Sequence, residues 1–414
     1  MKRVLQINPV IRKTTSTGKI MAEISAVAQT CGWESHIAYS RGRDGVPPDG
    51  GLFLPVGGRL SVALHGALTR LTDRHGLGSK LATYRFIRQV EKLDPDVIHI
   101  HNIHGYFLNY KMLFDYLGRS GKPVVWTVHD CWLYTGHCYH YDSIGCDRWK
   151  SGCHDCPQKR DFPSSLLADR SKRNFEDKRA AFTSLDKDRF VLVTVSGWMR
   201  DQMRESFLKG CRFEVIHNGI DTEMFAPVPA GNFIARHHLE GKHILLGVAN
   251  IWSREKGLDD FVRLASMLGD DEIIVLVGLG EARAASMPDK IVGLPRTASV
   301  EELREIYSAA DAFVNLTWQD NYPTVNMEAM ACGTPVVTYD TGGSGESVFE
   351  GAGAVVGQGD LEAVLAAVRQ IETRGRDFYV GRCRALALEH FNKVDCFKQY
   401  IDLYESLDEN TSTR

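Results

Sequence analysis

One segment, residues 311–346, restricts the fold of this chain more than any other. It reads DAFVNLTWQDNYPTVNMEAMACGTPVVTYDTGGSGE. The pattern predicts a buried strand over 312–316, a polar loop, a helix that begins at Pro323, and a strand over 335–339 that runs into the turn Gly342–Gly343. In a strand–loop–helix unit, N–H groups at the start of the helix point to the carboxyl edge of a parallel sheet, where phosphates bind. The segment therefore predicts an α/β fold with a phosphate site.

Two acids lie in this segment, Asp320 in the loop and Glu328 in the helix. A carboxylate does not attract phosphate, so we expect Glu328 to accept hydrogen bonds from sugar hydroxyl groups. Phosphate donors and hydroxyl acceptors in one loop predict a nucleotide-sugar site. We place Tyr322, Pro323 and Thr324, at the start of the helix, among the residues that bind the donor.

The same residues resemble the signature of the retaining glycosyltransferases of family 4. That signature joins an acid pair, the run Ala-Met-Ala-x-Gly-x-Pro-Val-Val, and Gly-Gly-x-x-Glu. This chain has Glu328, the run 329–337, and Gly342–Gly343 followed by Glu346, while Asp320 replaces the first glutamate. The resemblance implies a GT-B fold, in which two Rossmann-like, doubly wound domains face a cleft and the C-terminal helix crosses back to the first domain. It also implies that Asp320 and Glu346 position the donor sugar and that Glu328 binds the ribose.

A second loop resembles the family pattern Gly-Arg-x4-Lys-Gly, whose cations bind the donor diphosphate. Lys256 and Gly257 match the final pair, whereas Ala249–Asn250 replaces the first, and we expect Arg254 to supply the second charge. Cations at this position neutralise the leaving diphosphate. The alternative is that Lys256 and Arg254 are ordinary exposed loop charges.

Three further strand ends match the family. His129, in Thr-Val-His-Asp after a buried strand, resembles the histidine beside the donor sugar and is a catalytic candidate. Gly18, in the turn 14–19, and Gly278, in Gly-Leu-Gly, are donor-binding candidates, although a Ser/Thr-capped helix start also explains the turn at Gly18. Ser196 is first of all an N-cap. We assign three other histidines to the core or the rim: His99, His101 and His104.

The chain alternates between strand-length apolar runs and helical patterns, which predicts parallel doubly wound sheets. We expect a first domain over 1–220 and a second over 221–385, divided by a turn-rich linker. A crossover helix that packs on the first domain, followed by a polar disordered tail from Glu409, should occupy 386–414.

A cysteine-rich insert is expected over 131–157. Its spacing Cys138-x7-Cys146-x6-Cys153-x2-Cys156 suits a structural tetrahedral zinc ion. Free thiols and disulfides are the alternatives, and His137, His140 or His154 could replace a cysteine as a ligand. Similar inserts occur in the capsule and colanic-acid-type transferases of the family, and we expect no cofactor for catalysis.

Charge and hydropathy indicate the partners. Residues 1–200 hold 29 Lys and Arg against 19 Asp and Glu, which suits an anionic surface, although scattered solvated charges also explain this excess. Over 59–74, four leucines at helical spacing lie beside three arginines, which is typical of an interfacial helix, although such a stripe can also be core: Leu60, Leu64, Leu68 and Leu71, with Arg59, Arg70 and Arg74. The basic residues are not interleaved with aromatics, which argues against nucleic acid. Without a long apolar run, we expect a cytoplasmic enzyme, peripheral on the inner face of the plasma membrane.

The resemblance implies a hexosyltransferase that uses a nucleotide diphosphate sugar. We expect it to move a hexosyl or acetamido-hexosyl group, with retention, to a lipid-linked glycan in bacterial surface polysaccharide synthesis. The alternatives are a nucleotide-sugar 2-epimerase of GT-B architecture and a non-catalytic scaffold that binds sugar nucleotides.

Overall fold

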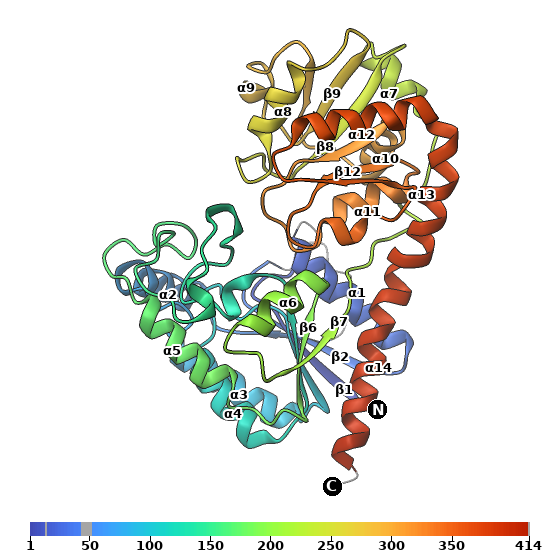
Figure 1. Cartoon of the computed structure of the whole chain (residues 1–414). Helices are drawn as coiled ribbons and strands as arrows, with labels where there is room; N and C mark the ends of the chain where they lie inside the picture. The colour runs from blue at the N-terminus through green and yellow to red at the C-terminus, as the bar shows by residue number, and fades with distance from the viewer. Residues whose placement is uncertain (13–14, 43–51, 413–414) are drawn as a thin grey trace. The chain divides into compact units, whose positions relative to one another are not determined.

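The computed structural model describes residues 1–12, 15–42 and 52–412. Thr14, in the turn at 14–19, lies outside the described residues. The chain forms two compact units (Figure 1). The first contains Met1–Ile216 and the C-terminal residues from Phe397, and the second contains His217–Cys396.

The first unit is built on a parallel sheet of seven strands in the order β3-β2-β1-β4-β5-β6-β7. Every residue of β4, β5 and β6 is buried, as expected for apolar strands covered on both faces. The order reverses between β1 and β4, which is the topological switch point of the sheet. The strands are β1 (Arg3–Ile7), β2 (Glu34–Tyr39), β3 (Leu52–Pro55), β4 (Val97–Ile100), β5 (Val124–Val128), β6 (Phe190–Thr194) and β7 (Arg212–Val215).

Helices cover this sheet. The helices are α1 (Ser16–Thr30), α2 (Arg59–Thr72), α3 (Lys80–Leu93), α4 (Tyr110–Ser120), α5 (Ser171–Phe182), α6 (Gly197–Glu205) and α14 (Lys393–Ser412). The helices α3, α4 and α5 lie side by side (Figure 1). Tyr404 and Tyr400 of α14 hydrogen-bond to His99 of β4 and Thr127 of β5, which fastens the C-terminal helix to the sheet. The insert contains only 3-10 turns: η1 (Cys131–Leu133), η2 (Asp142–Ile144) and η3 (Arg148–Lys150).

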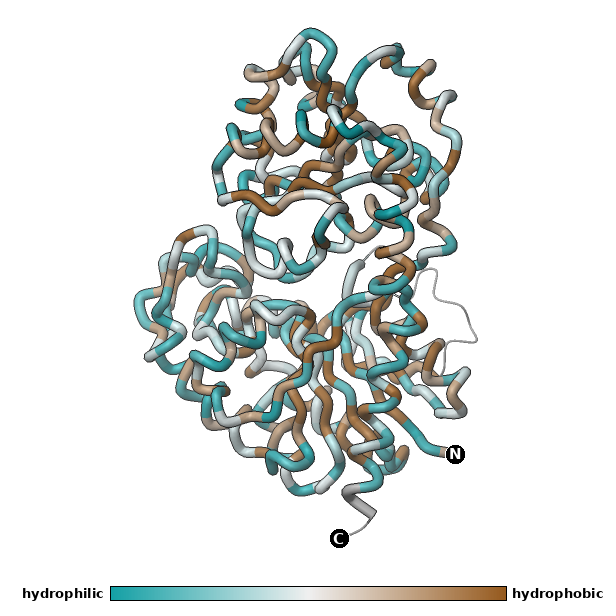
Figure 2. Tube along the Cα trace, turned by 45° about the vertical axis from the view of Figure 1, so that its right-hand side comes forward, coloured by the Kyte–Doolittle hydropathy of each residue, from teal (hydrophilic) through white to brown (hydrophobic). Residues whose placement is uncertain are grey.

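The second unit repeats the architecture with six parallel strands in the order β10-β9-β8-β11-β12-β13. Its switch point lies between β8 and β11. The strands are β8 (His243–Val248), β9 (Glu272–Val277), β10 (Ile291–Leu294), β11 (Ala312–Asn315), β12 (Val336–Tyr339) and β13 (Gly353–Val356). The helices are α7 (Gly231–Arg236), α8 (Leu258–Ala265), α9 (Glu281–Ala284), α10 (Val300–Ala309), α11 (Thr324–Ala331), α12 (Leu361–Arg374) and α13 (Arg376–Phe391), with the turn η4 (Gly345–Ser347). In both units the hydrophobic positions follow the strands (Figure 2).

The predicted α/β class with two doubly wound parallel sheets is confirmed. The C-terminal segment differs from the prediction, because two helices meet at Asn392 where one was expected. The polar residues from Glu409 to Ser412 continue α14 and are not the disordered tail that we predicted. Pro323 is the N-cap of α11 and not its first helical residue, so the missing proline N–H interrupts no helical hydrogen bond.

The leucine stripe of α2 does not belong to the core. Leu60, Leu64 and Leu71 are 73%, 63% and 51% exposed, and the buried positions of this helix are His65 and Thr69. The alternative that the stripe is ordinary core packing is therefore wrong. Among the described residues, no helix is both long enough and apolar enough to span a bilayer.

Candidate functional site

Two loops lie side by side at the switch point of the second unit, one after β8 and the other after β11. The carbonyl oxygen of Glu255 accepts hydrogen bonds from the Trp318 amide at 2.8 Å and from the Thr317 hydroxyl at 3.2 Å. Gly257 has a φ of +74°, and a Cβ there would overlap the carbonyl oxygen of Leu316. A glycine at this position therefore allows the two loops to approach each other.

This approach brings together two predicted site residues. Lys256 Nζ lies 2.7 Å from Asp320 Oδ2, and the two side chains are 39% and 22% exposed. Arg254 is exposed on the same loop as Lys256. The switch point thus presents an acid and two cations that a ligand can reach from solvent, which is where α/β sheets usually bind ligands.

The glycine turn after β12 holds the backbone of Asp320. Gly342 has a φ of +56°, and a Cβ there would overlap the Asp320 carbonyl oxygen, to which the Gly343 amide donates a hydrogen bond at 3.3 Å. The buried Asn326 amide of α11 donates to Ser347 Oγ at 3.0 Å and so ties the helix to this turn. Glu346 is exposed on the turn. We infer that the Gly-Gly motif positions the acid loop.

Glu328 lies on α11 and is partly buried. The Tyr307 hydroxyl of α10 donates a hydrogen bond to its Oε2 at 3.0 Å. Burial raises the pKa of Tyr307 well above its ordinary value, and the charge of Glu328 adds to the shift, so the phenol keeps its proton. Tyr307 was not predicted as a site residue, because a tyrosine on the buried face of an amphipathic helix resembles any core residue.

The start of α11 carries the three other predicted donor residues. Tyr322 is buried, and its ring stacks on His217 with centroids 4.6 Å apart and an interplanar angle of 16°. Pro323 is buried at the N-cap, and Thr324 is partly buried as the first helical residue. Tyr322 and Pro323 therefore hold the start of the helix, and Thr324 is more accessible.

The two predicted donor glycines have local steric reasons to be glycine. At the end of β9, Gly278 has a φ of +97°, and a Cβ would overlap the carbonyl oxygen of Ala249. In the first turn of α1, a Cβ on Gly18 would stand 2.9 Å from the carbonyl oxygen of Val10. Both positions keep backbones close together at strand ends.

In the first unit, His129 follows β5 and contacts a histidine that we had assigned to the core or the rim. Its Nε2 lies 3.1 Å from Nδ1 of His101, whose Nε2 lies 3.0 Å from Gln6 Oε1. Burial, with a smaller effect from nearby His104, lowers the pKa of His129 to about 4 against the opposing charge of Asp130. His129 is therefore neutral at pH 7 and held in place by His101.

The neighbouring Asp130 is fixed by two hydrogen bonds. Its Oδ2 lies 2.7 Å from Nε2 of His104, and its Oδ1 accepts from the Trp132 amide at 3.0 Å. Burial acts to raise the pKa of Asp130, but the charge and the hydrogen bond of His104 outweigh it and lower the pKa to about 2.

Ser196 precedes the first residue of α6. Its Oγ accepts a hydrogen bond from the Met199 amide, which confirms its N-cap role.

Each of the two units matches a known glycosyltransferase family. Residues 19–224 match the family described as Glycosyltransferase Family 4. Residues 242–373 match the family described as Glycosyl transferases group 1. The two matches contain most of the predicted site residues, and the predicted family is confirmed.

Individual relatives agree with this result. A putative colanic acid biosynthesis glycosyl transferase, WcaC of Escherichia coli (strain K12), is 26% identical over 418 residues, which cover 98% of this chain and 100% of that protein. Alpha-maltose-1-phosphate synthase of Mycobacterium tuberculosis (strain CDC 1551 / Oshkosh) is 30% identical over 247 residues, which cover 52% of this chain and 63% of that enzyme.

Solved structures show the fold. HepE of Anabaena in complex with UDP-glucose has a TM-score of 0.67 at 13% identity and covers 98% of this chain and 100% of its own. Sucrose-phosphate synthase of Thermosynechococcus elongatus has a TM-score of 0.67 at 16% identity, with coverages of 98% and 99%. The predicted GT-B fold is confirmed.

Proposed function

Because this chain belongs to the family 4, group 1 glycosyltransferases, we propose that it transfers a hexosyl or acetamido-hexosyl group, with retention, from a nucleotide diphosphate sugar to a lipid-linked glycan. The glycan would belong to a bacterial surface polysaccharide. A full-length relative named for colanic acid biosynthesis and fold neighbours with bound UDP and UDP-glucose support this proposal.

The observation that carries the proposal is the pairing of Lys256 with Asp320 at the switch point of the second unit. A donor diphosphate that enters here meets the ammonium group of Lys256 and the exposed guanidinium of Arg254. Asp320 is then released from its partner and accepts a hydrogen bond from the sugar. Glu328, positioned by Tyr307, accepts hydrogen bonds from the ribose.

In the proposed reaction, the bond between the anomeric carbon and the diphosphate oxygen breaks, and the acceptor oxygen forms a bond on the same face of the sugar. The acceptor proton passes to the leaving diphosphate. The chain contributes positioning and charge, since Lys256 and Arg254 stabilise the negative charge that develops on the diphosphate. His129, neutral at pH 7, provides a hydrogen bond to a hydroxyl group and not a charge.

The lipid-linked acceptor is proposed from the surface of α2. Leu60, Leu64 and Leu71 form an exposed apolar surface that Leu166 and Leu167 extend, because the Leu166 amide donates a hydrogen bond at 2.7 Å to the carbonyl oxygen of Arg70 at the end of α2. We call these five leucines the leucine surface. Three exposed arginines accompany it on or beside α2: Arg59, Arg70 and Arg74. Apolar side chains beside cations suit the interface of an anionic membrane.

The experiment is a transfer assay with a panel of radiolabelled nucleotide sugars and a lipid extract from a polysaccharide-producing bacterium. The proposal predicts that label from one donor enters the organic phase, and that the product keeps the anomeric configuration of the donor. Conversion of the donor to an epimer without any acceptor would indicate a 2-epimerase. Nucleotide binding without turnover of any donor would indicate a scaffold. Either result would overturn the proposal.

A further inference from the structure

Four cysteines of the insert line one small cavity in the first unit. The cavity has a volume of about 20 Å³, which is room for a single ion or water molecule. Its wall includes the four cysteines that the sequence spacing singled out: Cys138, Cys146, Cys153 and Cys156. All ten cysteines of the chain lie among the described residues and carry free thiols. None of the four has a role in the proposed transfer reaction.

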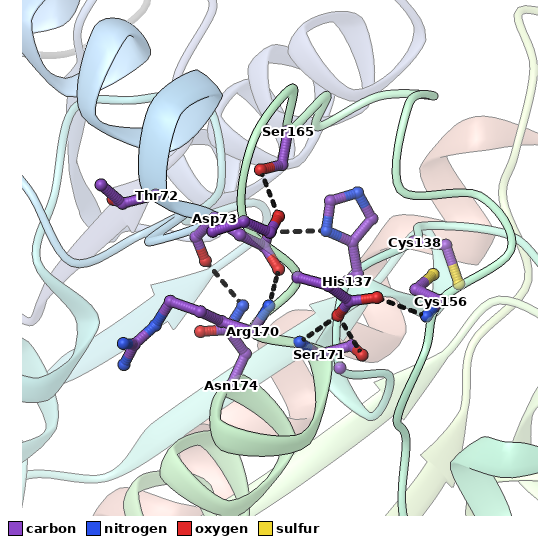
Figure 3. Close-up of polar contacts among 12 residues, drawn as sticks. Thr72, Asp73, His137, Cys138, Cys156, Ser165, Arg170, Ser171 and Asn174 are labelled. Carbon is purple, nitrogen blue, oxygen red and sulfur yellow. Dashed lines mark hydrogen bonds and ion pairs between the residues drawn. The ribbon is translucent and has the colours of Figure 1, made fainter.

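Two of these thiols already touch each other. Cys138 and Cys156 share a hydrogen bond between their side chains, and their sulfur atoms lie together in Figure 3. The sulfur of Cys153 accepts a hydrogen bond from the Gly136 amide at 3.1 Å. A Cβ on Gly136 would stand 2.6 Å from Cβ of Cys153, so this glycine allows the approach.

A buried histidine on the same wall has an unsatisfied nitrogen. His137 Nδ1 lies 2.7 Å from Asp73 Oδ1, and both side chains are fully buried (Figure 3). Asp73 is fixed in turn, since its Oδ2 accepts from the Arg170 amide at 2.8 Å. Nε2 of His137 finds no hydrogen-bond partner among the described residues, although His137 lines the cavity. A buried nitrogen without a hydrogen-bond partner destabilises the folded state. We therefore expect a group bound in the cavity to form a hydrogen bond with Nε2 of His137.

A buried lysine lies near the same cysteines. Lys178 of α5 is 1% exposed and donates to the carbonyl oxygens of Trp132 at 2.6 Å and Thr135 at 3.0 Å. Its ammonium group interacts electrostatically with Cys138 and Cys153. Burial lowers the pKa of Lys178 to about 7, and the neighbouring cysteines Cys153 and Cys138 act to raise it.

From this arrangement we propose that the cavity binds one Zn²⁺ ion through the thiolates of Cys138, Cys146, Cys153 and Cys156. Four sulfur ligands and room for one ion suit the tetrahedral geometry of structural zinc. Among the described residues, no three His, Cys, Asp or Glu side chains are already placed as metal ligands. Binding therefore requires the four thiols to move closer together and to lose their protons. His137 is a positioning residue: Asp73 accepts from its Nδ1–H and stabilises the imidazolium, whose Nε2–H then donates to a metal-bound sulfur.

The zinc ion would fasten the insert to two helices of the first unit. Asp73 follows the last residue of α2, and the Asn174 amide of α5 donates to the Asp73 carbonyl oxygen at 2.7 Å. The chain from Cys131 to Cys156 has only three short 3-10 turns of regular structure, so its order depends on side-chain contacts such as those among Tyr134, Tyr141 and Trp149 and, in this proposal, on the metal. Loss of the metal should therefore loosen the insert and the end of α2.

The test uses the full-length protein, purified under reducing conditions. Elemental analysis should give about one zinc per chain, and exchange with Co²⁺ should produce the absorption of tetrahedral cobalt with thiolate-to-metal charge transfer. Cys156→Ser should lose at least 100-fold in metal affinity. Cys211→Ser, which changes a cysteine of intermediate burial outside the insert, is the matched control and should keep the metal. His137→Ala should keep the four-thiolate cobalt spectrum and bind about 10- to 100-fold more weakly.

A second measurement uses only the wild-type protein, so it does not depend on whether the variants fold. Removal of zinc with a chelator should release one ion and make the insert susceptible to limited proteolysis, and added Zn²⁺ should reverse this. A folded protein without metal, in which neither Zn²⁺ nor Co²⁺ binds and these four cysteines react as independent thiols or are found as disulfides, would overturn the proposal. A cobalt spectrum that loses its tetrahedral form in His137→Ala would overturn the role given to that histidine.

Discussion

Replacement of Lys256 by alanine separates catalysis from stability. The ion pair with Asp320 joins side chains that are 39% and 22% exposed, so water screens it, and its loss should cost about 0–1 kcal/mol of folding free energy. A cation on the leaving diphosphate acts where charge develops in the transition state. Its removal should lower kcat/KM by about 100-fold or more, equivalent to about 2.7 kcal/mol or more. Lys256→Ala should therefore lose far more activity than stability.

The assay compares Lys256→Ala with Lys2→Ala. Lys2 forms a similar ion pair with Asp408 in the first unit, at 2.9 Å and with side chains 44% and 24% exposed. Both variants should unfold in urea within about 1 kcal/mol of the wild type. Initial rates at low donor concentration give kcat/KM for each, and only Lys256→Ala should fall.

The reasoning is refuted if Lys256→Ala keeps its fold and loses less than threefold in kcat/KM. Equal losses of activity in Lys256→Ala and Lys2→Ala would also refute it, because a general effect of losing a surface ion pair would then explain both.

Three other predictions concern separate parts of the molecule. Glu328→Gln should weaken binding of the free nucleoside diphosphate by about 1.5–3 kcal/mol in titration calorimetry, and Tyr307→Phe by less; unchanged affinity in Glu328→Gln would make it a structural residue. Leu60→Ser combined with Leu64→Ser should reduce co-sedimentation with anionic vesicles, and wild-type binding that is equal for neutral and anionic vesicles would contradict the charge argument. Because burial lowers the pKa of His129 to about 4, the unfolded chain takes up this proton at a higher pH than the folded chain does. The free energy of unfolding should therefore fall as pH falls from about 6.5 to 4. His129→Gln should reduce this pH dependence in urea unfolding, and an unchanged dependence of the unfolding free energy on pH would contradict the prediction.

The strand ends of this chain were predictable, whereas the contacts between them were not. Apolar runs and turn residues predicted strands over 312–316 and 335–339, which are β11 and β12, and the motif around Glu328 located α11. Sequence spacing does not reveal that Lys256 and Asp320 meet, since 64 residues separate them and the contact depends on the order of strands in the sheet. The same holds for the hydrogen bond from Tyr307 to Glu328, which joins two helices.

The spacing of apolar residues along a helix also does not show whether that face packs on the core or lies in solvent. The leucine stripe of α2 has the spacing of a core face, and only the fold shows that Leu60 and Leu64 lie in solvent. Likewise, His99 lies in β4 and His101 directly follows it, and both are fully buried, as core residues are. His99 bonds to Tyr404 of α14, whereas His101 contacts the candidate site residue His129. A polar residue in a strand needs its partners identified before its role is assigned.

The central claim is that the switch point of the second unit binds a nucleotide diphosphate sugar. It is tested most directly by thermal unfolding of wild type, Lys256→Ala and Glu328→Gln with a panel of nucleotide sugars and their free nucleoside diphosphates. A ligand at 100 times its Kd stabilises the folded state by about 2.7 kcal/mol. The account predicts that one nucleotide and the sugars that carry it raise the unfolding temperature of the wild type, and that both variants respond less. No response to any nucleotide, or an equal response in all three proteins, would contradict it.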